Sequence, residues 1–270
     1  MVRDWQSGIQ RVVKCVLSEM LRNPPAGLCV EPVYAHVDEK GGGYRSARRF
    51  TTQFLGQPDD QWKDDAIEPS NGDVFIGLDL APTLVPKMFD EGVYTMWRAR
   101  GVRIHFVVYD LLPVLRPEFF GPGAADDFSR WLGAIAQVAD SVACISRAVA
   151  HEFQAYLATS SIPRREGLRI DWFHLGSEFH GSDIASSASP VPVPAQPELE
   201  AKSYVLMVGT LEPRKGHLQI IDACETLWKQ GSDTCLVVVG RKGWLADEAR
   251  REDRKPSVPG HSIILVLRRR

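Results

Sequence analysis

The sequence predicts an α/β fold built on parallel sheets and divided into two units. Short apolar strands alternate with amphipathic helices along most of the 270 residues. The segment at 103–113 is apolar nearly throughout, which is typical of a strand buried in a parallel sheet. A segment rich in Ser, Ala and Pro, residues 181–198, separates two such alternating stretches and is expected to be a linker.

The first element is expected to be an amphipathic helix that begins after Ser7, a good N-cap residue. Its apolar side chains follow a 3.6-residue period (Ile9, Val12, Val13, Val16, Leu17, Met20 and Leu21), and it should end at the Asn-Pro-Pro of residues 23–25. An alternating β/α protein should have a strand before such a helix. We therefore expect the first domain to lack its first strand.

The remaining elements of the first unit follow from apolar runs and turn residues. We expect strands at 28–37, 72–80, 103–113, 141–146 and 167–176, and helices at 83–99, 124–138 and 147–157. Residues 38–72 are polar and contain three consecutive glycines, so a loop or partly ordered region is expected there.

The alternating pattern restarts after the linker and then changes abruptly. A strand at 203–209, a helix at 217–231 and a strand at 234–240 are followed, beyond Trp244, by polar sequence with one short apolar run at 263–267. We expect an N-terminal Rossmann-like domain at 1–180, a linker at 181–199, the start of a second Rossmann-like domain at 200–244 and an atypical tail at 245–270. Our hypothesis is a chain truncated at both ends.

Composition and missing motifs exclude several classes of protein. The net charge of −2 gives no general attraction to nucleic acid, and the five cysteines lack C-x-x-C spacing, which indicates a reducing compartment and no zinc site. There is no G-x-G-x-x-G, P-loop, G-x-S-x-G or Asp-x-Asp motif. Without a signal peptide or a membrane-spanning run, a cytoplasmic protein that can touch a membrane surface is expected.

The sharpest candidate for a binding site is the pair Arg214-Lys215, which follows a strand and Pro213 at an expected helix start. Two cations at the positive end of a helix dipole are unfavourable unless an anion binds there. Free backbone N–H groups together with the two cations would suit a diphosphate. The alternative is two solvated surface cations.

Other candidates lie where further strands end, because open parallel sheets bind ligands at that edge. Gly8 would let a phosphate or sugar approach the backbone, or it is a turn glycine. Asp110 would hold a sugar hydroxyl or accept a proton, or it caps the following turn. Arg147 could face the cleft, next to Ser146 as an N-cap residue.

Taken together, several segments resemble glycosyltransferase family 4, or group 1, of the GT-B fold. They are SGIQRVV (7–13), VVYDLLPVLRPEFF (107–120), CISRAVAHEF (144–153), HLGSEF (174–179), VGTLEPRKGH (208–217) and VVVGRKGW (237–244). The resemblance implies two Rossmann-like domains that face each other across a cleft. It also implies a retaining transferase that uses a nucleotide-diphosphate sugar and needs no cofactor.

The resemblance also assigns expected roles to residues of the donor site. Arg214 and Lys215 match the basic residues that hold the donor diphosphate, and Gly8 matches the glycine loop near the phosphates. Gly209 and Thr210 replace the Gly-Arg of many relatives. Arg214 and Lys215 are therefore expected to provide the positive charge of the site.

On the cleft side, Tyr109-Asp110 matches a segment where many relatives have His-Asp, and the resemblance implies a catalytic role for Asp110. Arg147 and Gly240 are expected to line the cleft as well. The family's Glu-x7-Glu segment should lie beyond Trp244, where nothing matches it.

The function implied is transfer of a sugar from a nucleotide-diphosphate donor to a glycan or lipid-linked acceptor in polysaccharide biosynthesis, at the inner face of the membrane. Two alternatives stay open. One is an inactive truncated remnant of such an enzyme, because the nucleoside and sugar contacts supply much of the rate. The other is a different nucleotide-sugar-binding Rossmann-type protein, such as an epimerase.

Overall fold

The protein, described here by a computed structural model, consists of two compact units. Unit 1 comprises residues 1–115 and 123–180, and unit 2 comprises residues 116–122 and 181–270. The structure describes residues 8–39, 41–57, 62–176, 203–241, 243 and 263–267. The expected linker at 181–199 and most of the tail at 245–270 lie outside these ranges.

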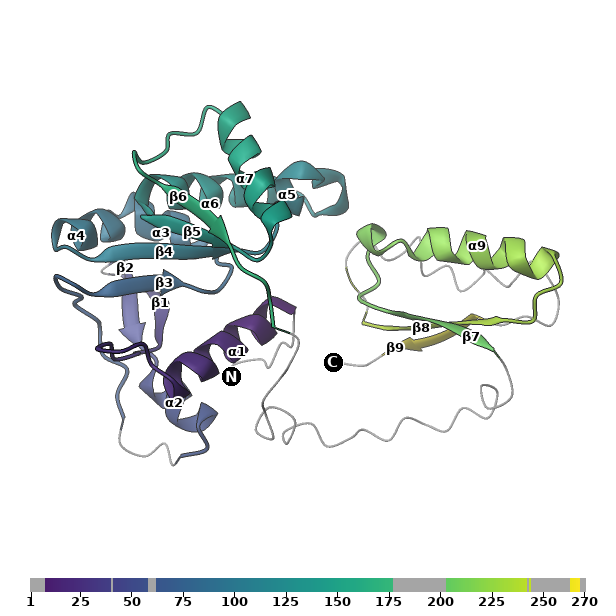
Figure 1. Ribbon diagram of the computed structural model, residues 1–270, viewed down its shortest axis with the longest axis horizontal. Coiled ribbons are helices and arrows are strands. Elements are labelled where there is room, and N and C mark those ends of the chain that lie inside the picture. The colour runs from purple at the N-terminus through teal and green to yellow at the C-terminus, as the bar shows by residue number, and fades with distance from the viewer. Residues whose placement is uncertain are drawn as a thin grey trace. The chain divides into compact units, whose positions relative to one another are not determined.

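Unit 1 is organised around a four-stranded parallel sheet in the order β3, β4, β5, β6 (Figure 1). The strands are β3 (Val74–Gly77), β4 (Arg103–Val108), β5 (Ser141–Cys144) and β6 (Arg169–Trp172). All pair in parallel, with Phe106 opposite Gly77 on one side and Val142 on the other. Since each strand is followed by a crossover and a parallel neighbour, their carboxyl ends share one edge of the sheet. The expected parallel α/β fold is confirmed.

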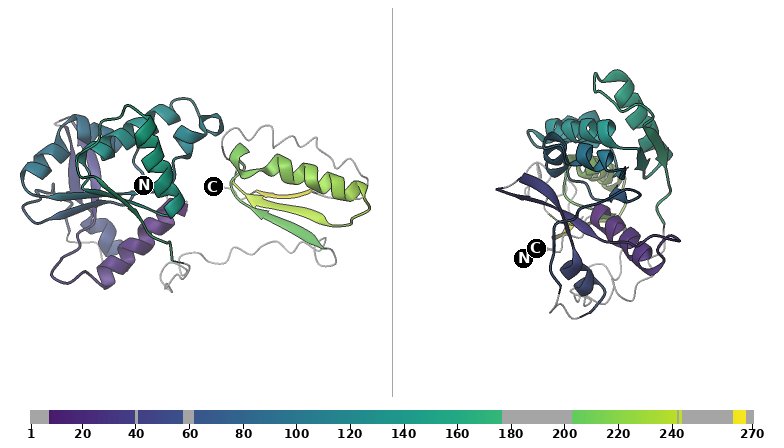
Figure 2. Two further views of the ribbon diagram at one scale, coloured as in Figure 1. Left: turned by 45° about the horizontal axis from the view of Figure 1, so that its top comes forward. Right: turned by 90° about the vertical axis from the view of Figure 1, so that its left-hand side faces the viewer.

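Helices cover both faces of this sheet, as Figures 1 and 2 show. On one side lie α3 (Leu84–Asp90), α6 (Ala124–Val138) and α7 (Arg147–Thr159); α1 (Gly8–Arg22) lies on the other. The apolar stripe of α1 is as expected, yet none of its residues is fully buried. In contrast, α6 has eight buried residues. Its first turn carries Asp126 and Asp127, whose negative charges interact favourably with the positive end of the helix dipole.

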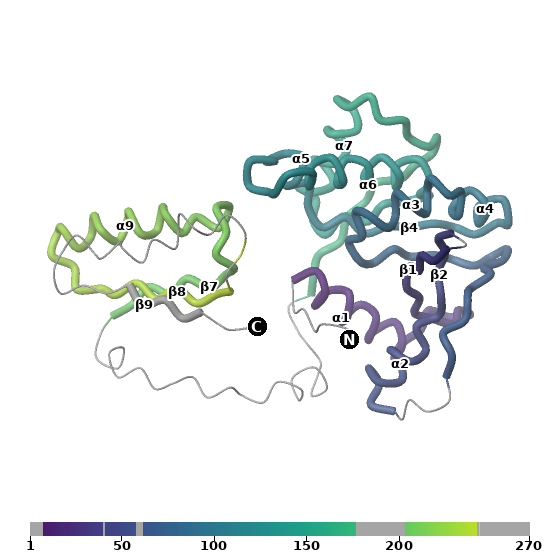
Figure 3. Tube along the Cα trace, turned by 180° about the vertical axis from the view of Figure 1, so that it is seen from behind, coloured from purple at the N-terminus to yellow at the C-terminus, as the bar shows by residue number. Residues whose placement is uncertain are grey.

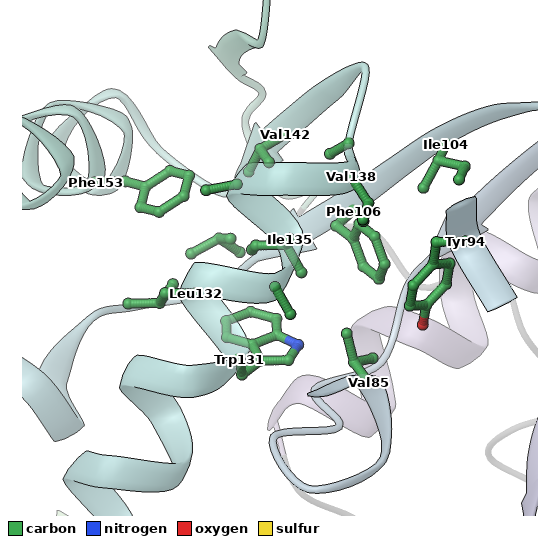
Figure 4. Close-up of a cluster of buried hydrophobic side chains, with 14 of the residues drawn as sticks. Val85, Tyr94, Ile104, Phe106, Trp131, Leu132, Ile135, Val138, Val142 and Phe153 are labelled. Carbon is green, nitrogen blue, oxygen red and sulfur yellow. The ribbon is translucent and has the colours of Figure 1, made fainter. Parts of the chain in front are cut away.

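The hydrophobic core of unit 1 lies between the sheet and the α3–α6–α7 layer (Figure 4). Trp131, Leu132 and Ile135 of α6 are completely buried against apolar side chains of β4 and β5. Burial of each such side chain contributes on the order of 1.5–3 kcal/mol to folding. The α6 layer therefore anchors the strands whose ends carry the candidate polar residues.

The single helix expected at 83–99 is wrong. The segment forms α3 and a second short helix, α4 (Val93–Ala99), separated by Glu91 and Gly92. Gly92 has φ = +74°, in the left-handed region that glycine adopts most easily, so the chain turns between the two helices. The strand expected at 103–113 is also shorter, because residues Leu112–Leu115 form a helical turn, α5.

The loop expected at 38–72 contains regular structure. Strand β1 (Val33–Asp38) pairs antiparallel with β2 (Gly41–Ser46), and α2 (Arg48–Phe54) follows directly (Figure 3). The glycines permit close packing, because a Cβ on Gly42 would lie 2.7 Å from the sulfur of Met88 on α3. Glycine inside a strand often marks such a close approach, so here it does not indicate a loop.

Unit 2 has a three-stranded parallel sheet in the order β7, β8, β9, with α9 (His217–Lys229) packed on it. The strands are β7 (Tyr204–Val208), β8 (Cys235–Gly240) and β9 (Ile263–Leu267). Trp228 and Ile221 of α9 pack with Leu236 and Val238 of β8 in a small second core. The tail, expected to be atypical, supplies β9, which pairs in parallel with β8.

None of the helices in the described residues combines the length and the apolar character needed to cross a lipid bilayer.

Candidate functional site

The candidate donor loop connects β7 to α9 in unit 2. It begins with Gly209 and Thr210 and passes through a 3₁₀ turn at Pro213–Lys215. Gly216, with φ = +73°, then reverses the chain so that α9 starts at His217. The cation pair therefore lies in the turn before the helix, and Pro213 starts this turn rather than α9. The free N–H groups of the first turn of α9 directly follow Lys215.

The loop is fixed to the end of β8 by backbone hydrogen bonds. The N–H of Gly209 donates to the Val239 carbonyl (2.9 Å), and that of Leu211 donates to the Arg241 carbonyl (2.9 Å). Gly240 lies so close to the loop that a Cβ there would overlap the carbonyl group of Gly209. These contacts bring together three of the residues expected at the site, namely Gly209, Thr210 and Gly240.

The two cations of the loop differ in their electrostatic environment. Nε of Arg214 lies 2.8 Å from Oε2 of Glu212, and the Glu212 side chain is only 14% exposed. Lys215 makes no ion pair with any residue that the structure describes. It lines an open groove with Gly216 and with Val205 and Met207 of β7. The positive charge available to an anion is therefore mainly that of Lys215, whereas the sequence predicted that both cations contribute.

Gly8 is the remaining residue expected at the diphosphate, and it lies in unit 1 as the first residue of α1. It is exposed, and no atom lies within 4 Å of the position that a Cβ would take. The expected diphosphate-binding residues are thus divided between the two units.

Tyr109 and Asp110 follow β4 at the carboxyl edge of the unit 1 sheet. The Tyr109 hydroxyl donates a 2.7 Å hydrogen bond to the carbonyl of Leu78, and its side chain is 6% exposed. Burial, with a smaller effect from the charge of Asp79, raises the pKa of Tyr109. Oδ1 of Asp110 accepts the N–H of Leu112 (3.0 Å), which is the cap of the following turn that was considered as its alternative role.

The end of β5 supplies Ser146 and Arg147. Oγ of Ser146 accepts the N–H of Val149 (3.2 Å), which confirms the expected N-cap of α7. Arg147 is exposed at the first residue of α7 and has no ion-pair partner among the described residues. Of the side chains expected at this edge, Tyr109, Asp110 and Ser146 make hydrogen bonds within the fold.

Asp79, which follows β3 at the same edge, is not among the residues expected from the sequence. Its side chain is exposed, but the surrounding protein raises its pKa by desolvation, against a lowering effect of the hydrogen bond from the Leu80 N–H. A carboxylate that is accessible yet partly desolvated is typical of a binding cleft. The reasoning applied to Asp110, a carboxylate just after an apolar strand, would have found it.

No group of three or more His, Cys, Asp or Glu side chains that could hold a metal ion occurs in the described residues.

Comparison with known proteins shows which family the chain resembles. The sequence model for "Glycosyl transferases group 1" matches residues 193–257. Two proteins from Escherichia coli, each named serotype-specific mannosyltransferase WbdA, are 36% and 34% identical to this chain over 250 and 247 residues, which is 90% of the chain in both cases. The chain is therefore similar to group 1 glycosyltransferases, in residues 193–257 by the family model and over most of its length by the two relatives. It spans about 29% of the length of these two relatives.

The region matched by the family model contains the whole candidate donor loop, including Gly209, Thr210, Lys215 and Gly240. Two solved structures are also similar to the chain, with low sequence identity. An α,α-trehalose-phosphate synthase (UDP-forming) from Burkholderia vietnamiensis has a TM-score of 0.46 at 13% identity, over 76% of this chain and 48% of its own. The α,α-trehalose 6-phosphate synthase from Burkholderia multivorans has a TM-score of 0.44 at 12% identity, over 90% and 64%.

Proposed function

We propose that the protein is a group 1 glycosyltransferase that takes part in transfer of mannose from a nucleotide-diphosphate donor to a saccharide acceptor, with retention of configuration, in polysaccharide biosynthesis. The single observation that carries the proposal is the loop before α9, where Lys215, which has no ion-pair partner among the described residues, precedes a helix start that no side chain caps. Mannose as the transferred sugar comes from the names of the E. coli relatives.

The chemistry required of the loop is stabilisation of a leaving group. In the transfer, the bond between the anomeric carbon and the diphosphate oxygen breaks, and the acceptor oxygen forms a bond to that carbon. The acceptor proton leaves with the diphosphate. Negative charge grows on the diphosphate as its bond breaks, so a preorganised cation and helix N-terminus lower the barrier. No cofactor takes part in this proposal.

The Glu212–Arg214 ion pair assigns unequal roles to the two cations. Lys215 would bind the diphosphate directly, whereas Arg214 would first have to weaken its 2.8 Å contact with Glu212. A hydrogen bond between charged groups contributes about 1.5–3 kcal/mol, which corresponds to a roughly 10- to 150-fold change in Kd. We expect Lys215→Ala to lose affinity in this range and Arg214→Ala to lose several-fold less.

The test is titration of the full chain with a panel of nucleotide-diphosphate sugars that includes GDP-mannose, by calorimetry and thermal shift. Lys229→Ala is the matched control, because Lys229 is an exposed cation at the opposite end of α9. Glu212→Gln should tighten binding by releasing Arg214. A flat response of the wild-type chain across the panel would overturn the proposal. Donor binding without transfer to any saccharide would instead favour the inactive form considered from the sequence.

We also propose that the protein acts on the cytoplasmic side of a membrane and touches it peripherally. The support is three exposed apolar side chains, Phe50 of α2, Leu55 just after it and Trp62, which expose 39%, 46% and 54% of their surface. Exposed aromatic and aliphatic side chains favour the lipid interface. Co-sedimentation with anionic lipid vesicles should fall for Trp62→Ser. Equal sedimentation of both proteins would contradict this proposal.

A further inference from the structure

We propose that Asp79 binds a hydroxyl group of the acceptor saccharide, and that Tyr109 holds Asp79 in place for this role. The inference rests on the proposed transfer function and adds two residues of unit 1 to it. It starts from the position of Asp79 in the parallel sheet.

Asp79 lies at the edge where an open parallel sheet binds its ligands. It is two residues beyond Gly77, which pairs with Phe106, and therefore lies level with the last residue of β4. The neighbouring strands β4 and β5 end at the same edge with Tyr109, Asp110 and Ser146.

The polar groups of these two neighbouring strand ends are used inside the fold. Asp110 accepts the N–H of Leu112, Ser146 accepts that of Val149, and the Tyr109 hydroxyl donates to Leu78. Asp79, like Asp110, accepts a single local hydrogen bond, from the N–H of Leu80 to its Oδ1 (2.9 Å), but Asp79 is exposed whereas Asp110 is half-buried. No other described residue donates to the Asp79 carboxylate. One carboxylate oxygen is therefore left for a ligand.

The environment of this carboxylate selects the kind of ligand. Its side chain is open to solvent on one side, while the protein on the other side desolvates it and raises its pKa. No ion pair between Asp79 and a described cation offsets the free energy of this desolvation. An ionised carboxylate only accepts hydrogen bonds, and a sugar hydroxyl supplies such a donor without bringing a charge into the cleft.

The Tyr109 hydroxyl fixes the backbone that carries Asp79. Its 2.7 Å hydrogen bond to the Leu78 carbonyl joins the end of β4 to the residue immediately before Asp79. The ring is buried, so the phenol cannot itself reach a bound sugar, and the charge of Asp79 is near enough to raise the phenol pKa further. Tyr109 is thus a positioning residue, and Asp79 is the residue that contacts the acceptor.

The experiment measures binding of two ligands to the full chain, α-mannotriose as acceptor probe and GDP-mannose as donor probe. Asp79→Asn keeps the shape of the side chain and should raise the acceptor Kd about tenfold or more, with the donor Kd changed less than twofold. Tyr109→Phe keeps the carboxylate but removes the tether, and should raise the acceptor Kd about threefold to tenfold, again without effect on the donor. Asp126→Asn, an exposed carboxylate in the first turn of α6, is the control and should leave both values unchanged.

Unchanged acceptor binding by Asp79→Asn would overturn the inference, as would a wild-type chain that binds GDP-mannose but no mannotriose. A wild-type chain that binds mannotriose but no nucleotide sugar would overturn the proposed function while Asp79 could still be assessed. If Asp79→Asn does not fold, judged by circular dichroism, Tyr109→Phe carries the test alone. A Tyr109→Phe chain that weakens both ligands equally would contradict the positioning role.

Discussion

Gly240 offers a direct test of how the donor loop is built. In Gly240→Ala, the new Cβ would overlap the Gly209 carbonyl oxygen and lie 2.9 Å from its carbon. Non-bonded carbon atoms prefer about 3.5–4.0 Å, so the carbon contact alone requires a separation of roughly 0.6–1.1 Å, and the overlap with the oxygen requires more. That movement would break the 2.9 Å hydrogen bond from the Gly209 N–H to Val239.

The expected loss of stability follows from these two effects. Overpacking costs about 1–3 kcal/mol, and a lost hydrogen bond costs about 0.5–1.5 kcal/mol, so unit 2 should lose on the order of 2–4 kcal/mol. Gly209→Ala is the matched control, because the nearest atom to its Cβ would be Lys215 Cδ at 4.0 Å. Neither glycine has a positive φ, so backbone strain does not distinguish the two variants.

Urea unfolding of unit 2, followed by NMR signals of α9, measures the difference. The Gly240→Ala midpoint should fall by about 1 M or more for a typical urea dependence, while the unfolding free energy of Gly209→Ala should stay within about 0.5 kcal/mol of wild type. Equal midpoints for the two variants would refute the close approach of the two strand ends.

Three further changes probe unit 1 by chemical denaturation. Burial raises the pKa of Asp140, but hydrogen bonds and two arginines lower it overall. The contribution of Asp140 to folding stability should therefore be complete above the unfolded pKa of about 3.9 and be lost as pH falls through the lower folded pKa. Asp140→Asn should remove this pH dependence. Ser146→Ala should cost about 1 kcal/mol through loss of the α7 cap, with a Thr substitution as the control. Tyr94→Phe should cost about 1–3 kcal/mol by leaving the buried Tyr44 hydroxyl without its 2.7 Å partner, and adding Tyr44→Phe should recover part of that loss; additive losses would contradict the pairing.

The sequence was most informative where a long periodic segment packs on the main core. The boundaries of α6 agree with the expected 124–138, because its apolar stripe, its acidic first turn and Gly123 at its start all indicate one helix. It was misleading at β2, where three glycines usually indicate a loop. Glycine is needed there because Met88 and Glu91 leave no room for a Cβ at Gly42, a tertiary constraint that local sequence patterns do not contain.

In the candidate site, too, the sequence predicted local features but not those that depend on tertiary contacts. Strand ends could be located from apolar runs, so the sequence correctly placed Asp110, Arg147 and the Arg214-Lys215 pair in segments that follow strands. Which side chain remains available depends on hydrogen bonds between segments distant in the sequence, such as the 31-residue separation between Tyr109 and Leu78. This is why the use of Tyr109 inside the fold and the availability of Asp79 were not foreseen.

The shallow packing of α1 has a consequence for ligand binding. A helix with no fully buried residue opens at a low free energy compared with α6, so its backbone amides should exchange with solvent early. A ligand that binds to α1 would bind only the ordered form of this helix. A tenfold excess of such a ligand over its Kd would stabilise the ordered helix by about 1.4 kcal/mol. Amide exchange in α1 would therefore report the fraction of protein that has the ligand bound.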